Sequence, residues 1–291
     1  MEYWGLQVFY GVSYSGLLFL LASGLTLIFG VMRIVNVTHG SYYLLSGYIG
    51  YSIMKVSHSY LLGLLIGTVC IILIGLFMER LFLRKLKGND LGQFLLTTGF
   101  ALVIQDLALI IWGGTPRTIP IPKLLTGSLE IGTMHLPRYR LFILFVAFLI
   151  GLALWLLQKK TGIGANIRAA IDNSEMAQAM GINVPVLSMG VFGLGAMVAG
   201  IAGVVGAGFL SLYPGLDFEI IPYVFIVVIL GGMGSLEGAI LGSLIVGLVD
   251  NFGRAFIPEM SYFTLFVPMA LMLTIRPTGL FGKLQGRQGV E

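Results

Sequence analysis

The chain has 291 residues, of which 57% are hydrophobic and only 10% are charged, and its net charge is +4. Soluble domains carry about 25% charged residues, so this composition excludes a soluble protein and predicts an integral membrane protein. The positive charge does not indicate nucleic-acid binding, because the basic residues lie at the ends of the apolar segments, where they report topology.

Long apolar segments predict the membrane-spanning helices, since a helix needs about 20 apolar residues to cross the hydrocarbon core. One apolar region, 218–254, is interrupted at Gly231, Gly232 and Gly234, and each half is just long enough to cross. We therefore predict an all-α integral membrane protein, a polytopic bundle of eight or nine transmembrane helices, in one permease domain over 1–291. The other predicted crossings are 8–30, 37–56, 60–79, 91–112, 140–158, 186–210 and 261–277.

Lysine and arginine residues predict the orientation of the chain. With nine crossings, eleven of the 17 basic residues fall on one side, which the positive-inside rule assigns to the cytoplasm. The N-terminus is then outside, the C-terminus is inside, and the loop at about 113–139 is the main soluble element outside. The eleven inside residues are Arg33, Arg80, Arg84, Lys85, Lys87, Lys159, Lys160, Arg168, Arg276, Lys283 and Arg287.

Two stretches interrupt the apolar pattern, one in each half of the chain. They are residues 33–39 and 231–238. Paired interruptions of this kind indicate broken or re-entrant helices near a transport path. Two tight turns between crossings would give the same pattern, and both interpretations stay open. Asn36 or Thr38 is predicted to cap the helix after the first interruption, and Ser235 the helix after the second.

Polar residues inside the apolar segments are the candidates for a translocation pathway, because polar and ionisable groups in a membrane are costly. Asn36, Thr38 and His39 lie in the first interruption. Asp106 lies well inside the fourth segment, where it either faces a polar path or pairs with a neighbouring helix. Proton- or sodium-coupled carriers usually need carboxylates near the midplane, and this chain has few, which weakens secondary transport.

Motifs for nucleotide or metal chemistry are absent from the sequence. There is no GxxxxGK[ST] phosphate loop, no nucleophile elbow and no HExxH helix. The histidines His39, His58 and His135 do not have the spacing of metal ligands. The sequence therefore predicts no enzyme, no metal site and no cofactor in this chain.

A polar stretch, residues 159–188, separates the fifth and sixth apolar segments. A membrane protein needs only a few residues to reverse direction, so a polar stretch of this length predicts contact with a partner outside the bilayer. Asp172 and Glu175 have the spacing of a capping box, and Gly181 is a left-handed helix stop. We predict a hairpin of two short helices at about 159–185, with one apolar stripe for the lipid surface or a partner's groove. The predicted stripe consists of Ile167, Ile171, Met176, Ala179 and Met180.

Three stretches resemble a known family of membrane permeases. RAAIDNSEMAQAMGI resembles the EAA-type coupling loop of ABC importer permeases. Residues 22–50 and 229–247 resemble signature stretches of LivH-type branched-chain amino-acid ABC transporter permease subunits. The likeness covers nearly the whole chain, in order. The coupling motif departs from the fuller pattern, because Met176 follows Glu175 and the alanines come later, at positions 177 and 179.

The resemblance implies the membrane-spanning subunit of an ATP-binding-cassette importer for leucine, isoleucine and valine in the cytoplasmic membrane of a prokaryote. Its implied partners are a second related permease subunit, two cytoplasmic ATPase subunits that hold ATP and magnesium, an extracytoplasmic amino-acid-binding protein, and membrane lipid. Contact with the ATPases is then assigned to Arg168, Asp172, Glu175, Ala179 and Gly181.

Three alternatives stay open beside this interpretation. An ABC permease for urea or short amides would have the same fold. A secondary carrier or channel would transport without ATPases, and a membrane scaffold would not transport at all.

Overall fold

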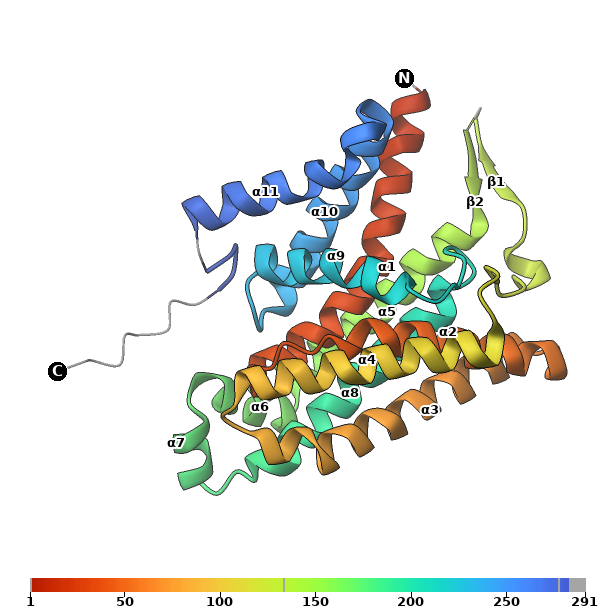
Figure 1. Cartoon of the computed structure of the whole chain (residues 1–291). Helices are drawn as coiled ribbons and strands as arrows, with labels where there is room; N and C mark the ends of the chain where they lie inside the picture. The colour runs from red at the N-terminus through yellow and green to blue at the C-terminus, as the bar shows by residue number, and fades with distance from the viewer. Residues whose placement is uncertain (1, 133, 277, 283–291) are drawn as a thin grey trace.

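In the computed structural model, which describes residues 2–132, 134–276 and 278–282, most of the chain is helical (Figure 1). The longer helices are α1 Glu2–Met32, α2 Thr38–Ser57, α3 Tyr60–Leu81, α4 Asp90–Trp112, α5 Arg138–Lys160, α8 Val184–Gly206, α9 Leu216–Gly231, α10 Leu236–Phe256 and α11 Ser261–Ile275. The shorter elements are α6 Gly162–Asp172, α7 Ser174–Ala179, β1 Ser128–Ile131, β2 Met134–Pro137 and the 3-10 turns η1 Leu83–Leu86, η2 Lys123–Leu125 and η3 Pro258–Met260.

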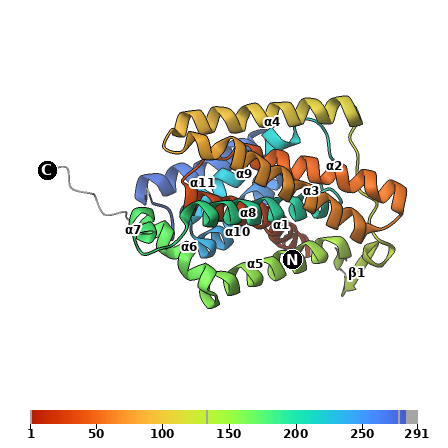
Figure 2. The same cartoon turned by 90° about the horizontal axis from the view of Figure 1, so that it is seen from below.

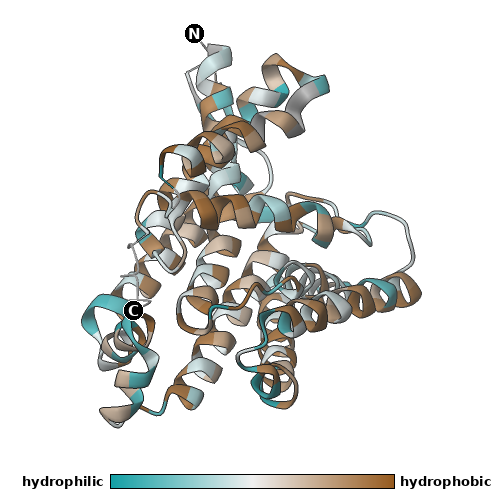
Figure 3. Cartoon of the chain, turned by 60° about the vertical axis from the view of Figure 1, so that its left-hand side comes forward, coloured by the Kyte–Doolittle hydropathy of each residue, from teal (hydrophilic) through white to brown (hydrophobic). Residues whose placement is uncertain are grey.

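Six helices in the described part of the chain are long and apolar enough to cross a membrane: α1, α3, α4, α5, α8 and α10. Hydrophobic residues predominate along the long helices (Figure 3). The prediction of a helical membrane protein is confirmed. Eight or nine crossings are not confirmed by length and composition, because α9 has 16 residues and α11 has 15, and α2 is rich in Ser, Gly and Tyr.

Helix α1 is the centre of the bundle. It packs against α5, α8, α9 and α10, and its residues Leu17, Leu18, Leu20 and Leu21 are completely buried. A helix that is apolar around its whole circumference is buried by its neighbours. Figure 2 shows the consequence: α4 and α5 lie on opposite outer sides, with α1, α8 and α10 between them.

The second interruption is a tight turn between α9 and α10. Gly231 is the last residue of α9 and lies against Gly238 in α10. Gly232 and Gly234 have φ values of +99° and +86°, which glycine adopts at no steric cost. Ser235 caps α10, since its Oγ accepts a hydrogen bond from the Gly238 amide at 3.0 Å, so the predicted cap is confirmed.

The first interruption has a different geometry. After α1 the chain leaves the helix at Arg33, whose φ is +57°. His39 Nε2 then lies 2.9 Å from the carbonyl oxygen of Leu21, which is eleven residues, or about 16 Å of helix, before the end of α1. Residues 33–37 therefore run back along α1, and α2 begins beside the middle of α1 rather than at its end.

The loop at 113–139 contains η2 and a hairpin of β1 and β2. The strands pair antiparallel, with Leu129 opposite Leu136. A bridge between Arg117 and Leu212 ties the loop to the segment that follows α8. Figure 1 shows β1 and β2 at the end of the molecule opposite to α6 and α7.

Candidate coupling and translocation sites

The polar stretch forms the short helices α6 and α7, which we call the coupling hairpin. Thr161 caps α6 through a 3.1 Å hydrogen bond from the Gly164 amide. The cap of α7 is Asn173, whose Oδ1 accepts from the amides of Glu175 and Met176 at 3.0 Å. The predicted capping box was therefore wrong by one residue: Asp172 ends α6, and Asn173, which has an equivalent acceptor, caps α7.

Gly181 ends the coupling hairpin in the left-handed conformation, with φ +88°. The amide of Gly181 donates to the carbonyl oxygen of Gln178 at 2.9 Å, and the Ile182 amide donates to Ala177 at 3.0 Å. The predicted helix stop is confirmed. A Cβ at this position would meet nothing within 4 Å, so the backbone conformation, not crowding, makes glycine favourable here.

The apolar residues of the hairpin do not form the single stripe that we predicted. Ile167 in α6 is buried, and Ile171 lies beside Gly30 at the end of α1. Met176 and Met180 instead have exposed fractions of 61% and 78%. Because Asn173 breaks the helix between them, α6 faces the bundle and the methionines of α7 face outward.

All five residues assigned to ATPase contact are exposed on this hairpin: Arg168, Asp172, Glu175, Ala179 and Gly181. The Arg168 guanidinium donates to the carbonyl oxygen of Gln158 in α5. One residue further along, Lys159 forms an ion pair with Glu237 at 3.2 Å. These contacts attach the base of the hairpin to α5, and the end of α5 to the start of α10.

A buried polar cluster surrounds the start of α2. Asn36, Thr38 and His39 are all fully buried. The Thr38 hydroxyl donates to the carbonyl oxygen of Thr97 in α4 at 2.7 Å. Neither Asn36 nor Thr38 caps α2, because Val37 is the cap residue and no side chain accepts a hydrogen bond there. That predicted cap was wrong, since the Thr38 hydroxyl is used between helices instead.

Several polar atoms of this cluster have no hydrogen-bond partner among the described residues. They are both amide atoms of Asn36, the Nδ1 of His39 and the Oδ1 of Asp217. The other carboxylate oxygen of Asp217, at the start of α9, accepts from the Ser41 hydroxyl at 2.6 Å. The cluster thus joins α1, α2, α4 and α9 and keeps unused hydrogen-bonding capacity in its interior.

Asp106 does not belong to this cluster. It is exposed, on helix α4, which lies at the outside of the bundle (Figure 2). The described residues offer it no hydrogen bond or ion pair. Pairing with a neighbouring helix of the same chain, one of the two alternatives for Asp106, is therefore not seen in the described part of the molecule.

Three residues of the cluster, Thr97, Ser41 and Asp217, were not predicted from the sequence. Thr97 and Ser41 lie in apolar segments without any motif, so no pattern separates them from ordinary helix residues. Asp217 had a signal, because it is a carboxylate at the border of an apolar segment. Like Asp106, Asp217 is an ionisable group in an apolar part of the chain, where such groups are costly and indicate a functional site.

Comparison with known proteins agrees with the resemblance seen in the sequence. The high-affinity branched-chain amino acid transport system permease protein LivH of Salmonella typhimurium is 27% identical, over 95% of both chains. BraD, from the corresponding system of Pseudomonas aeruginosa, is also 27% identical over 95% of both chains. A probable LivH of Methanocaldococcus jannaschii is 27% identical over 93% of this chain and 90% of its own.

The family model described as branched-chain amino acid transport system / permease component matches residues 7–275. This range begins inside α1 and reaches the last residue of α11, so it includes the coupling hairpin, the polar cluster and the turn after α9. The chain belongs to the family of permease components of branched-chain amino acid transport systems.

Proposed function

We propose that this chain imports leucine, isoleucine and valine across the cytoplasmic membrane, as the permease subunit of an ABC importer driven by separate ATPase subunits. The observation that carries the proposal is the capped, exposed coupling hairpin at one end of a permease of this family. Its substrate follows from the relatives, which are named for branched-chain amino acid transport. No nucleotide site is assigned to this chain, and ATP and magnesium belong to the partner subunits.

The proposed topology has nine crossings, made by α1 to α5 and α8 to α11, with the N-terminus outside and the C-terminus inside. The ion pair between Lys159 and Glu237 supports it, because the end of α5 and the start of α10 must then lie on the same side. On the opposite, external side of the membrane, the Asn251 amide donates to Gln7 Oε1 at 2.6 Å, which joins the last part of α10 to the start of α1. The coupling hairpin is then cytoplasmic, and β1 and β2 are outside.

The coupling hairpin is proposed to receive the ATPase subunits. Its five exposed residues supply charged and small contacts, and Met176 and Met180 add flexible apolar side chains that adapt to a partner's groove. Gly30 lies beside both Ile171 of the hairpin and Gly234 of the turn after α9. A displacement of the hairpin is thus passed to α1 and to the turn at Gly231, Gly232 and Gly234. A second permease subunit and an extracytoplasmic binding protein complete the proposed importer.

The translocation pathway is proposed to pass Asn36, Thr38 and His39. Helix α2 begins inside the bundle, where the positive end of its helix dipole stabilises an anionic group. In transporters of amino acids, the ends of such broken helices bind the substrate carboxylate. The unpaired amide of Asn36 supplies a donor and an acceptor at the same place. Asp106 is proposed to line the path where this subunit meets the second permease, because an exposed carboxylate in a membrane helix needs polar surroundings.

Uptake by cells tests the substrate. We expect cells that express the complete transporter to accumulate labelled leucine, isoleucine and valine, and cells without this chain to lose that uptake. Accumulation of labelled urea or acetamide instead would assign the transporter to short amides. Unchanged leucine uptake after alanine replacement of Asn36, Thr38, His39 and Asp106 together would remove the pathway assignment.

A further inference from the structure

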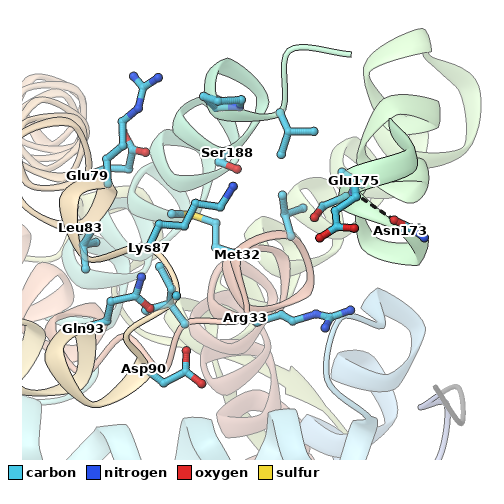
Figure 4. Close-up of a pocket in the computed structure, with 18 of the residues that line it drawn as sticks. Met32, Arg33, Glu79, Leu83, Lys87, Asp90, Gln93, Asn173, Glu175 and Ser188 are labelled. Atoms are coloured by element: carbon cyan, nitrogen blue, oxygen red, sulfur yellow. Dashed lines mark hydrogen bonds between the residues drawn. The ribbon is translucent and has the colours of Figure 1, made fainter. Parts of the chain in front are cut away.

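A cavity of about 420 Å³ lies behind the coupling hairpin (Figure 4). Its walls come from the end of α1, the end of α3 with η1, the start of α4, the hairpin itself and the start of α8. None of Asn36, Thr38, His39 and Asp106 lines it. It is therefore distinct from the proposed pathway, and its volume is in the range of small-molecule sites, about 300–1,000 Å³.

One buried carboxylate oxygen in the wall of the cavity has no hydrogen-bond partner among the described residues. Glu79, in the last turn of α3, is 2% exposed, and its Oε2 receives no hydrogen bond from the described residues. Arg84 and Arg80 interact electrostatically with this carboxylate but do not donate to Oε2. Burying a carboxylate oxygen without a hydrogen bond is costly, so this position favours a ligand with a cationic N–H donor.

The cavity also contains a cation that faces its interior. Lys87, just after η1, extends across the cavity toward Ser188 in α8 (Figure 4). Apolar side chains complete the lining, among them Met32, Leu83 and Val184. The cavity thus combines an acceptor for a cation, a donor for an anion and an aliphatic surface.

This combination selects a class of ligand. The lining mixes both charges, because the cations Arg33, Arg84 and Lys87 line the cavity together with the carboxylates Glu79, Asp90, Asp172 and Glu175. A ligand that carries both charges matches this lining better than a simple anion. A metal ion is not favoured, since no group of three or more His, Cys, Asp or Glu residues in the described part of the chain is arranged to hold one. A zwitterion with an aliphatic side chain satisfies all three parts of the lining.

We propose that this cavity binds a zwitterionic aliphatic amino acid from the cytoplasm. Its ammonium group lies on Glu79 and its carboxylate on Lys87, and its side chain packs on Met32 and Leu83. The identity of this amino acid as the imported product rests on the proposed function. Asn173 and Glu175 of the coupling hairpin form part of the wall. A bound amino acid therefore fills the space into which the hairpin would move, and it slows the ATPase cycle when product accumulates.

The test uses the complete transporter in nanodiscs, with its binding protein present, saturated with L-leucine and in excess. ATP hydrolysis is measured while the concentration of free L-leucine is raised. We expect hydrolysis to fall in the wild type, and the half-inhibitory concentration to rise at least tenfold in Glu79→Gln and in Lys87→Gln. Lys85→Gln is the matched control, because Lys85 is an exposed cation of η1 that does not line the cavity. It is expected to keep the wild-type inhibition.

Two analogues test the charge requirement. 4-Methyl-2-oxopentanoate lacks the ammonium group and leucinol lacks the carboxylate, so neither is expected to inhibit. Inhibition by either analogue as strong as by leucine would overturn the proposal, as would equal inhibition of both variants and wild type, or none in the wild type. The proposed function fails in a different way, if the loaded binding protein does not stimulate hydrolysis at all.

The test does not depend on assembly of Glu79→Gln. Lys87→Gln replaces a side chain that is exposed, so this variant is expected to assemble even if Glu79→Gln does not.

Discussion

The Asn36 side chain is fully buried, and neither of its amide atoms has a hydrogen-bond partner among the described residues. Leaving a buried donor or acceptor unpaired costs about 1–3 kcal/mol. Leucine has nearly the same shape and no polar atoms, so it would remove this cost. That asparagine stands here despite the cost is consistent with a role in the proposed pathway.

Asn36→Leu therefore separates stability from transport. We expect the thermal unfolding midpoint of the purified complex to stay the same or rise, because an unpaired polar group is removed, while ATP-driven leucine uptake falls at least tenfold. Both are measured on the same preparation. Wild-type uptake by this variant would contradict a role of Asn36 in the pathway.

Thr38→Val has the opposite expected effect on stability. It removes the 2.7 Å hydrogen bond to the Thr97 carbonyl oxygen and leaves that acceptor buried, which we expect to cost about 1 kcal/mol or more. The measurement is the thermal unfolding midpoint. Thr98→Val is the control, because the Thr98 hydroxyl only donates to Phe94 within its own helix on an exposed face. Equal midpoints for the two variants would show that the bond between α2 and α4 does not stabilise the fold.

Among the helices, most positions follow from local sequence patterns, whereas most long-range contacts do not. The helix stop at Gly181 and the cap at Ser235 depend on local chemistry, and both were confirmed. The polar residues at 33–39 indicated a break in the helix. Their spacing contains no information on the direction of the chain after the break, which is fixed by contacts with Leu21 and Thr97.

The coupling hairpin shows a second limit of sequence patterns. The two short helices were predicted with Ile167 and Met180 on one shared apolar stripe, but helical spacing fixes the relative position of side chains only within one helix. Asn173 is the C-cap of α6 and the N-cap of α7, and the angle between the two helices, which the sequence pattern does not contain, places Met180 away from Ile167. The position of the hairpin as an exposed segment was still predictable, because its polar residues distinguish it from the apolar segments on either side.

The helix stop gives the sharpest test of the hairpin. Gly181→Val places a β-branched residue at φ +88°, and Glu175→Arg reverses a charge on the exposed surface of α7. We expect the double variant to lose co-purification of the ATPase subunits and ATP-dependent uptake. Gly190→Val is the control, since Gly190 also has open space around it but lies inside α8. Assembly and uptake that survive the double substitution would contradict the coupling assignment.

At the scale of the whole molecule, the proposed orientation places the loop with η2 outside and the coupling hairpin inside. Leu124 and Met180 are exposed by 82% and 78%, and Cys70 is the one cysteine of the chain. In a Cys70→Ser background, a membrane-impermeant maleimide is expected to label Leu124→Cys in intact cells. It should label Met180→Cys only after permeabilisation. Labelling of Met180→Cys in intact cells, and of Leu124→Cys only after permeabilisation, would show that the orientation is opposite to the proposed one.

Transport by this subunit is proposed to depend on ATPase partners that act through the coupling hairpin. The most direct measurement compares leucine uptake into liposomes that contain this chain alone with uptake into liposomes that contain the complete transporter. We predict uptake only for the complete transporter, and only with ATP on the side of the hairpin and the binding protein on the other. Saturable leucine uptake by this chain alone, without ATPases, would contradict the account and show a carrier or channel that works by itself.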